Sequence, residues 1–316
     1  MKHQKMYLAA DSGGSKTIWS LISAEGETIF EYKTIGVGAV KSGILPVEET
    51  VLNAANEINK IGKPEGIFMS LGGPNVEEVQ AALTKAWQGV PVEVEREARG
   101  DAVLYAASFY GCSAVVMCGT GSVAVGFNEN GKSFSGGWGP VYGDGGSGGG
   151  MGTQALKLFL RYIDKDGEIG GLATLFTHLT QGLDITDFDG RMELKSRAIS
   201  MSRRELAALA PKIYALAEKG DKTCLCLYED AAREIAQMAY TVSKNSPDTK
   251  VMLCGGFFAE KPLLFKMCKS FFAEKSDAQL LLCPEFNPIV GAKLSVLKNN
   301  SVTITNEIFD SVSNKL

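Results

Sequence analysis

One pattern of β-rich runs and glycine turns occurs twice in this chain. In the first copy, between residues 6 and 31, an apolar strand is followed by a glycine turn, a second strand, a polar turn and a third strand. The second copy repeats this order between residues 114 and 135. Short β-rich runs bounded by glycine are typical of strands joined by tight turns. Such self-similarity predicts two homologous α/β lobes, each offering one glycine-turn hairpin to a shared cleft.

Further helices and strands are predicted around these two copies. Apolar residues recur at helical spacing in seven segments, at residues 47–61, 76–87, 103–109, 202–218, 227–243, 262–272 and 288–297. Short apolar runs at residues 66–71, 250–254 and 280–283 and an alternating run at residues 92–95 predict four more strands. We therefore expect an N-terminal lobe of residues 1–112 and a C-terminal lobe of residues 113–296. The tail, residues 297–316, packs on the N-terminal lobe or is a frayed end, and residues 167–200 carry no clear pattern.

Composition places the chain among ordinary globular proteins. Of its 316 residues, 45% are hydrophobic and 22% are charged, so sizeable cores can form. The formal net charge is -4, and no block of Lys or Arg occurs. A chain without a basic patch lacks the electrostatic surface that attracts nucleic acids and anionic membranes. We therefore expect neither a nucleic-acid partner nor a membrane partner.

Cysteine and histidine usage argues against a metal centre built on these residues. The seven cysteines are an odd number without Cys-x-x-Cys spacing, which indicates neither a disulfide framework nor a zinc ribbon. Only two histidines are present, His3 near the N-terminus and His178 in a polar segment. The N-terminal residues lack a signal-peptide core, and no apolar run reaches transmembrane length. The prediction is a cytoplasmic protein in a reducing compartment.

The first glycine turn is a candidate phosphate cradle. It superficially resembles a Walker A loop, but Ser15 stands where that loop has a glycine before its lysine, and a β-branched strand follows instead of a helix. The P-loop interpretation therefore fails. A hairpin turn can still direct successive N–H groups at an anion. The residues predicted to do so here are Gly13, Gly14, Ser15, Lys16 and Thr17.

Asp11 stands at the end of the buried strand before this turn. A carboxylate in that place is costly unless a cation or several donors meet it. Two interpretations follow, a residue that positions Mg²⁺ and an aspartate that caps the turn. In the second copy of the pattern, the corresponding turn consists of Gly119, Thr120, Gly121 and Ser122.

A glycine-rich stretch follows the second copy and covers residues 136–152. Ten of its seventeen positions are glycine, yet Trp138, Tyr142 and Asp144 interrupt them. A flexible linker would carry Gly and Ser throughout, whereas this composition lets backbone approach a ligand or adopt positive φ. Apolar residues at helical spacing follow at Ala155 and Phe159, so the stretch leads into a helix. The alternative is a loop that fills space between two sheets.

Four motifs together resemble those of the BadF/BadG/BcrA/BcrD ATPase family, over roughly residues 6–296. They are the turn of residues 11–17, the turn of residues 119–122, the segment of residues 136–144 and the doublet Gly255 and Gly256. In that family they correspond to the phosphate, second phosphate, sugar-loop and adenosine motifs. The family includes N-acetylglucosamine kinase and belongs to the actin, sugar kinase and Hsp70-like ATPase superfamily. The resemblance implies an α/β fold of two ribonuclease-H-like, actin-like lobes with ATP in the cleft between them.

The resemblance also implies roles for individual residues. Mg²⁺ and ATP would be held by Asp11, the two turns and the doublet, and the sugar by Gly73, Trp138, Gly139 and Asp144. In similar sugar kinases, an Asp that starts the helix after strand 92–95 is the general base that accepts the hydroxyl proton during phosphoryl transfer. Register puts Asp101 in this role and leaves Glu97 as the fallback. An N-cap is the alternative function of Asp101.

The sequence departs from the family pattern at several positions. Gly145 stands where the family has Glu, Gly100 where it has Asn, and Phe258 where Ser or Thr is frequent. The Asn expected near residues 36–39 is absent. Because two of these residues normally lie near the sugar, the identity of the sugar is left open.

Residues and resemblance together predict an ATP-dependent kinase of a small carbohydrate, an amino sugar or an N-acetylhexosamine such as N-acetylglucosamine. ATP and Mg²⁺ would be its cofactors, and the resemblance implies a homodimer. Two other functions stay open. One is an ATPase subunit that couples ATP hydrolysis to an acyl-CoA reductase or dehydratase through an iron–sulfur cluster. The other is a sugar or nucleotide sensor without catalysis.

Overall fold

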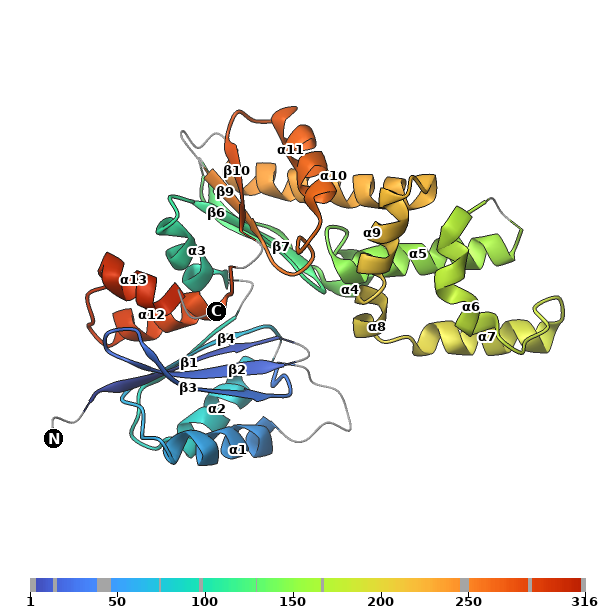
Figure 1. The fold of residues 1–316 in the computed structure, drawn as a ribbon. Coiled ribbons are helices and arrows are strands. Elements are labelled where there is room, and N and C mark those ends of the chain that lie inside the picture. The colour runs from blue at the N-terminus through green and yellow to red at the C-terminus, as the bar shows by residue number, and fades with distance from the viewer. Residues whose placement is uncertain are drawn as a thin grey trace. The chain divides into compact units, whose positions relative to one another are not determined.

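The computed structural model divides the chain into two compact units. It describes residues 4–13, 16–38, 47–73, 75–96, 99–128, 130–165, 168–244, 250–283 and 286–313. The first unit consists of residues 1–112 and 286–316, and the second of residues 113–285. Figure 1 labels the helices and strands of both units.

A five-stranded mixed sheet with the strand order β3-β2-β1-β4-β5 forms the centre of the first unit. Its strands are β1 (Met6–Ser12), β2 (Thr17–Ser23), β3 (Thr28–Thr34), β4 (Ile67–Leu71) and β5 (Val92–Arg96). β1 pairs antiparallel with β2 and parallel with β4, and β4 pairs parallel with β5. The carboxyl ends of β1, β4 and β5 therefore lie at the same end of the sheet.

Helices cover both faces of this sheet. α1 (Val47–Asn59) and α2 (Val76–Ala86) cover one face, and α12 (Ile289–Asn299) lies against the other (Figure 1). Strands that are covered on both faces read as near-continuous apolar runs, and every residue of β2 and β4 is buried. β3, at the edge of the sheet, instead alternates between half-buried and exposed residues.

The second unit repeats this sheet. Its strands are β6 (Ala114–Cys118), β7 (Ser122–Asn128), β8 (Gly131–Gly136), β9 (Lys250–Cys254) and β10 (Gln279–Cys283). Their order, β10-β9-β6-β7-β8, matches that of the first sheet strand for strand when each unit is numbered from its own start. β6 again pairs antiparallel with the next strand and parallel with β9. The predicted duplication of an α/β lobe is confirmed.

The remainder of the second unit is helical. Its helices are α4 (Gly139–Tyr142), α5 (Gly148–Ile163), η2 (Gly170–Phe176), α6 (Thr177–Thr180), α7 (Phe188–Ser200), α8 (Arg203–Ala207), α9 (Ala210–Glu218), α10 (Lys222–Ser243) and α11 (Pro262–Ala273). The single helix predicted over residues 202–218 is wrong, because the chain breaks it into α8 and α9. Pro211 stands in the first turn of α9, where its missing N–H is tolerated, whereas it would interrupt a continuous helix.

Residues 286–296 lie in the first unit, which differs from the predicted boundary at residue 296. α12 accounts for the difference, because a Cβ at Gly291 would come within 2.6 Å of the Ala102 carbonyl oxygen of α3 (Asp101–Ser108). α13 (Asn306–Ser313) follows, and its Val312 is fully buried. A Cβ at Gly26, in the turn after β2, would lie 2.8 Å from Val312. The C-terminal helices are therefore integral to the first unit.

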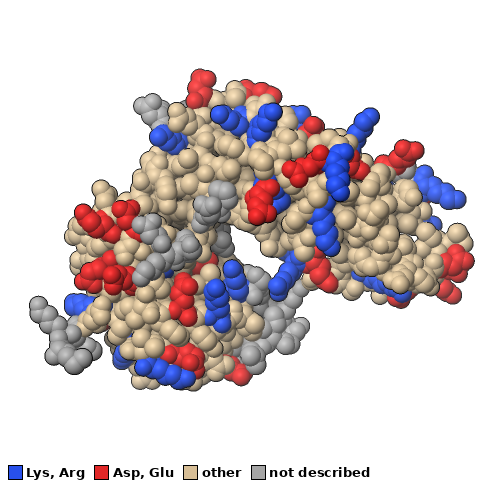
Figure 2. Space-filling view, in the orientation of Figure 1, with Lys and Arg blue, Asp and Glu red and all other residues tan. Residues whose placement is uncertain are grey.

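The surface charges and the length and polarity of the helices are both typical of an ordinary globular protein. On the face drawn in Figure 2, Lys and Arg side chains are interspersed with Asp and Glu. Every helix in the described part of the chain is too short or too polar to cross a lipid bilayer.

Differences in thiol burial give a first testable prediction. Cys226 on α10 is exposed, whereas Cys118 and Cys268 are buried. Burial raises the pKa of the Cys118 thiol well above its usual range and that of Cys268 to about 12. Because the thiolate is the nucleophile, iodoacetamide at neutral pH should modify Cys226 in the folded protein and spare these two thiols until it unfolds. Peptide mass spectrometry measures this, with Cys226→Ser as the control. Native-state modification of Cys118 would contradict the packing described here.

Candidate active site

Predicted site residues of the first unit gather where its parallel strands end. Asp11 lies near the end of β1, Gly73 shortly follows β4, and Asp101 begins α3 after β5. Register pairs Asp11 with Ser70 of β4, and Ser70 with Glu95 of β5. Because register partners on neighbouring strands point to the same face of a sheet, these three polar residues form one row near the carboxyl ends of the strands.

The turn between β1 and β2 is tight. The Gly13 N–H donates to the Lys16 carbonyl oxygen at 3.0 Å, and Lys16 is exposed. Gly14 and Ser15 lie outside the described residues. The described part of the turn therefore presents one ammonium group to solvent.

Thr17 lies in the core and not on the surface of this turn. Its side chain is fully buried. The hydroxyl oxygen lies 2.8 Å from the Ser12 hydroxyl and 3.2 Å from the Ile35 carbonyl oxygen, and it accepts a hydrogen bond from the Val37 N–H at 3.2 Å. These bonds connect the hairpin to the chain that follows β3. The hydroxyl is thus directed away from the position that the phosphate-cradle interpretation gave it.

Glu95 caps α3. The N–H of Asp101 donates to Glu95 Oε1 at 2.8 Å, and the N–H of Ala102 also donates to this carboxylate. The N-cap position itself belongs to Gly100, whose φ is 68°. Asp101 is the first helical residue, so the interpretation of Asp101 as the N-cap is wrong. A buried carboxylate from the preceding strand satisfies the helix N–H groups instead.

The Asp101 side chain is about half exposed. One carboxylate oxygen, Oδ2, lies 2.5 Å from Nε of Arg99, and the side chain retains 45% of its accessible surface. Glu97, the fallback for the base, lies outside the described residues. Asp101 is therefore held at the end of the sheet by its backbone bond to Glu95, with its carboxylate reachable from solvent.

In the second unit, the turn between β6 and β7 leaves backbone donors available. The Gly119 N–H donates to the Gly121 carbonyl oxygen at 2.8 Å. Within the described residues, the N–H groups of Thr120 and Gly121 donate to no partner, and Thr120 is exposed. Adjacent backbone N–H groups that are not used within a chain can bind an anion.

The second half of the glycine-rich stretch packs against this turn. The N–H groups of Gly148 and Gly149, at the start of α5, donate to the carbonyl oxygens of Gly119 and Thr120 at 2.9 and 3.1 Å. A Cβ at Gly149 would lie 2.4 Å from the Thr120 carbonyl oxygen. The close approach of two backbones explains why glycine is needed here. The predicted helix after the stretch is confirmed.

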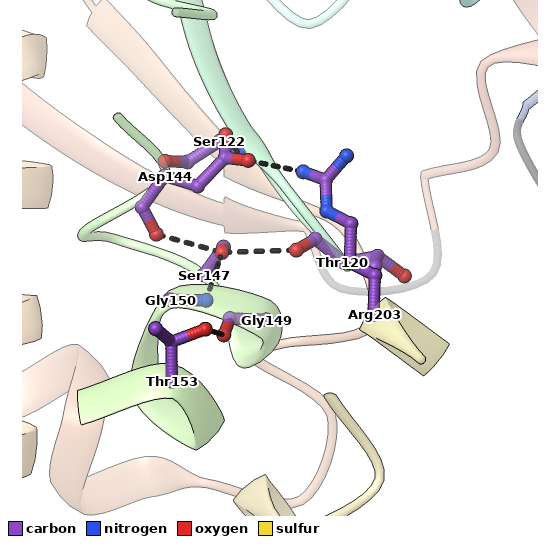
Figure 3. Close-up of polar contacts among 8 residues, drawn as sticks. All are labelled: Thr120, Ser122, Asp144, Ser147, Gly149, Gly150, Thr153 and Arg203. Carbon is purple, nitrogen blue, oxygen red and sulfur yellow. Dashed lines mark hydrogen bonds and ion pairs between the residues drawn. The ribbon is translucent and has the colours of Figure 1, made fainter. Parts of the chain in front are cut away.

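Ser147 holds the loop in place immediately before α5 (Figure 3). Its buried Oγ lies 2.7 Å from the Asp144 carbonyl oxygen and 3.0 Å from that of Thr120. The same atom accepts a hydrogen bond from the Gly150 N–H at 3.1 Å. Ser147 is thus the N-cap of α5 and connects the turn, the loop and the helix.

Asp144 has a buried side chain, and its backbone adopts a conformation that favours glycine. Its φ is 65° and its side chain is 4% exposed. Oδ1 accepts a hydrogen bond from the Ser122 N–H at 3.0 Å, and Oδ2 forms an ion pair with Arg203 (Figure 3). A non-glycine residue in this region of φ/ψ space persists only where its surroundings hold it, and such residues cluster at functional sites.

Trp138 and Gly139 lie in the open half of the stretch. Trp138 is 77% exposed. Gly139 has a φ of 80°, and a Cβ there would meet no atom within 4 Å. The stretch therefore divides into residues 136–143, which present aromatic surface, and residues 144–152, which pack on the β6–β7 turn.

The two glycines after β9 differ in their surroundings. Gly255 has a φ of 102°, and a Cβ there would lie 2.4 Å from the Cys118 carbonyl oxygen. A Cβ at Gly256 would instead meet no described atom within 4 Å. Phe258, where the family often has Ser or Thr, is buried in the core. Packing against β6 thus requires Gly255, while Gly256 leaves its side of the backbone open.

Three residues of this region were missed by reasoning from the sequence. They are Glu95, Ser147 and Arg203, which respectively cap α3, cap α5 and pair with Asp144. A Ser directly before a helical segment, such as Ser147, is a recognisable N-cap signal. The other two contacts carried no such local signal, and Arg203 is 59 residues from Asp144.

The fold and the site together define a class of protein. Two five-stranded sheets of one strand order, each with a glycine turn between its first two strands, are an α/β arrangement of the actin-like ATPase fold. A provisionally named N-acetylglucosamine kinase from Chromobacterium violaceum is similar with a TM-score of 0.71 and 21% identity, covering 93% of this chain and 99% of that one. A ROK family glucokinase from Streptomyces griseus is similar with a TM-score of 0.55 and 16% identity, covering 93% and 99%.

The chain belongs to the BadF/BadG/BcrA/BcrD ATPase family, which matches it over residues 10–296. An N-acetyl-D-glucosamine kinase of Dictyostelium discoideum is 24% identical over 324 residues, covering 94% of this chain and 99% of the relative. An N-acetylmuramic acid/N-acetylglucosamine kinase of Clostridium acetobutylicum is 35% identical over 130 residues, covering 38% and 39%. The family inferred from the four motifs is confirmed.

Proposed function

We propose that this protein transfers the γ-phosphoryl group of ATP to a hydroxyl of a small amino sugar or N-acetylhexosamine. The observation that carries the proposal is the packing of two glycine segments, the start of α5 on the β6–β7 turn and Gly255 on the end of β6, in a chain similar along 94% of its length to an N-acetyl-D-glucosamine kinase. Phosphoryl transfer needs positioning and charge stabilisation more than covalent chemistry from the protein. Backbone donors and charged side chains suffice for this.

Phosphate binding is assigned to the two hairpin turns. In the second unit, the N–H groups of Thr120 and Gly121 would donate to phosphate oxygens. In the first unit, Lys16 would contribute its ammonium group, and the bond from the Gly13 N–H to the Lys16 carbonyl oxygen would hold the turn in shape. Thr17 contributes through its backbone alone, because its hydroxyl is bonded within the core. The open backbone at Gly256 would receive the adenosine.

Asp101 is assigned as the general base. A carboxylate suits this role because the hydroxyl proton leaves late in a loose transition state, and orientation of the acceptor matters more than its basicity. The side chain is half exposed, and the bond from its N–H to Glu95 fixes the backbone. Asp101 would accept the proton from the sugar hydroxyl as that oxygen attacks the γ-phosphorus.

Asp11 fits a Mg²⁺ ion bound together with the phosphates. Mg²⁺ is usually held by one or two carboxylates, retained waters and substrate phosphates, not by an all-protein cage. Within the described residues, no group of three His, Cys, Asp or Glu side chains could hold a metal ion, and a single half-buried carboxylate at the end of β1 agrees with that mode. The ion would neutralise charge on the phosphate oxygens when bound.

The sugar is assigned to the open half of the glycine-rich stretch. The exposed Trp138 offers an apolar face, and Gly139 leaves backbone accessible beside it. Asp144, the predicted acceptor of sugar hydroxyls, lies in the packed half, is 4% exposed and pairs with Arg203, so we assign the sugar to Trp138 and Gly139 instead. Gly73 would contribute from the end of β4. Glu234 of α10 fills the space beside Gly145, where a Cβ would lie 3.0 Å from its Cγ, so a carboxylate is present near this position in spite of the glycine.

Sugar-dependent ADP release tests the proposal. Purified protein with Mg²⁺ and ATP is incubated with glucosamine, N-acetylglucosamine, N-acetylmuramic acid, N-acetylmannosamine or glucose, and with no sugar. We expect one or more of the amino sugars to stimulate ADP release well above the control without sugar. Equal release in every sample would instead favour the energy-coupling ATPase, and binding of sugar without release would favour a sensor. A homodimer stays a prediction, which light scattering measures.

A further inference from the structure

Arg203 lies against the glycine turn between β6 and β7. It is the first residue of α8, and a Cβ at Gly121 would come within 2.4 Å of its Nη2 atom. The Ser202 hydroxyl and the Glu205 side chain form a capping box around this helix start, which fixes the backbone of Arg203. A guanidinium group is therefore held directly beside backbone N–H groups that are open to a ligand.

A buried carboxylate sets the direction of this guanidinium. Asp144 pairs with Nη2 through Oδ2, while its Oδ1 accepts from the Ser122 N–H at 3.0 Å. The strained backbone of Asp144 is supported by Gly150, where a Cβ would lie 2.1 Å from the Asp144 carbonyl oxygen. The loop thus has to keep this conformation. The Asp144 side chain thus connects Ser122, the last residue of the turn, to Arg203.

Most of the hydrogen-bonding capacity of Arg203 is not used within the described chain. A guanidinium has five N–H donors, and the described residues accept only at Nη2, through Asp144. The side chain retains 41% of its accessible surface. Figure 3 shows the other terminal nitrogen pointing away from Asp144. An arginine held along one edge by a carboxylate can present its other edge to the oxygens of a phosphate.

We propose that Arg203 contacts the phosphate chain of the nucleotide at the turn of residues 119–122, and that Asp144 is its positioning residue. This inference rests on the proposed kinase function and names a further binding residue for its nucleotide. The pairing with Asp144 orients the guanidinium before binding, so less side-chain entropy is lost when the phosphates arrive. The turn would donate backbone N–H groups to the phosphate oxygens, and Arg203 would donate the N–H groups of its side chain.

Nucleotide binding by two neighbouring arginine variants tests this inference. Arg203→Gln removes the proposed contact, and Arg204→Gln removes the same charge from the next residue of α8, which is exposed. Calorimetric titration with adenosine, AMP, ADP and ATP measures each affinity. We expect Arg203→Gln to weaken binding of ADP or ATP by about 10- to 100-fold, the range for a lost charge-assisted hydrogen bond. Adenosine binding should stay unchanged, and Arg204→Gln should match the wild type.

The outcomes separate this inference from the function on which it rests. If the wild-type protein binds ATP and Arg203→Gln binds it equally well, the inference is wrong and the kinase proposal stands. If adenosine affinity falls as much as ATP affinity, Arg203 acts on the structure of the site and the inference is again wrong. If the wild type binds no nucleotide, both are wrong. Arg203→Lys, which keeps the charge but not the fork, should bind ATP with intermediate affinity and guards against misfolding of the glutamine variant.

Discussion

Asp101→Asn should lower kcat by about 100- to 10,000-fold, the usual contribution of a general base, with little change in the affinity for ATP. The substitution keeps the size of the side chain and leaves the backbone bond from residue 101 to Glu95 in place. The amide cannot accept the hydroxyl proton. Sugar-dependent ADP release gives kcat, and calorimetric titration gives the ATP affinity.

Glu95→Gln is the matched control for this variant. Glu95 is 7% exposed and caps α3, so its amide should weaken the cap and lower the free energy of unfolding by about 0.5 to 2 kcal/mol. Any loss of kcat in Glu95→Gln should come together with a fall in melting temperature. Asp101→Asn should instead lose kcat and keep the wild-type melting temperature. If Asp101→Asn turns over as fast as the wild type, Asp101 is not the general base, and Glu97 becomes the candidate.

Gly255→Ala should destabilise the second unit by about 2 to 4 kcal/mol. Two costs combine at this position. The φ of 102° is unfavourable for any residue with a Cβ, and that Cβ would lie 2.4 Å from the Cys118 carbonyl oxygen. Backbone atoms of β6 cannot move aside as a flexible side chain could. For a unit of the length of residues 113–285 the melting temperature should fall by about 4 to 16 °C, which calorimetry or circular dichroism measures.

Gly256→Ala provides the comparison one residue later. A Cβ there meets no described atom within 4 Å, so the melting temperature should stay near that of the wild type. If adenosine binds against this open backbone, as proposed, the methyl group should instead weaken nucleotide binding. Equal melting temperatures for the two variants would contradict the packing of Gly255 on β6.

The strands, their duplication and the family could be predicted because their signals are local and repeated. β1, β2, β6 and β7 are short β-rich runs in two pairs, each pair joined by a glycine turn, and such runs are recognisable from period and composition. The parallel strands β4, β5, β9 and β10 are predicted in the same way. The carboxyl ends of parallel strands meet at one end of a sheet, which brings Asp11, Gly73 and Asp101 to a common region of the first unit.

Tertiary contacts account for what the sequence could not indicate. The carboxylate of Asp144 was assigned to sugar hydroxyls, but its present partners are the Ser122 N–H and Arg203, which only the folded chain brings near. Thr17 reads as part of a phosphate loop, yet burial between strands directs its hydroxyl into the core. Alternation in a strand fixes which residues share a face, and the packing of neighbouring elements decides which face is buried.

The predicted extent of one helix was wrong because tertiary structure also decides where a helix ends. Apolar periodicity continues across residues 202–218, so it predicts one helix, but the folded chain separates α8 from α9. The predicted start near residue 202 is nevertheless correct, because Arg203 is the first residue of α8 and lies beside the β6–β7 turn.

The fate of the γ-phosphoryl group tests the central claim most directly. Wild-type protein and Asp101→Asn are incubated with γ-labelled ATP, Mg²⁺ and the sugar that best stimulates ADP release, and the products are separated by chromatography. The proposed kinase predicts that wild-type protein transfers the label to the sugar and that the variant transfers far less. Label released as inorganic phosphate at the same rate with and without sugar would contradict the assignment of this protein as a sugar kinase.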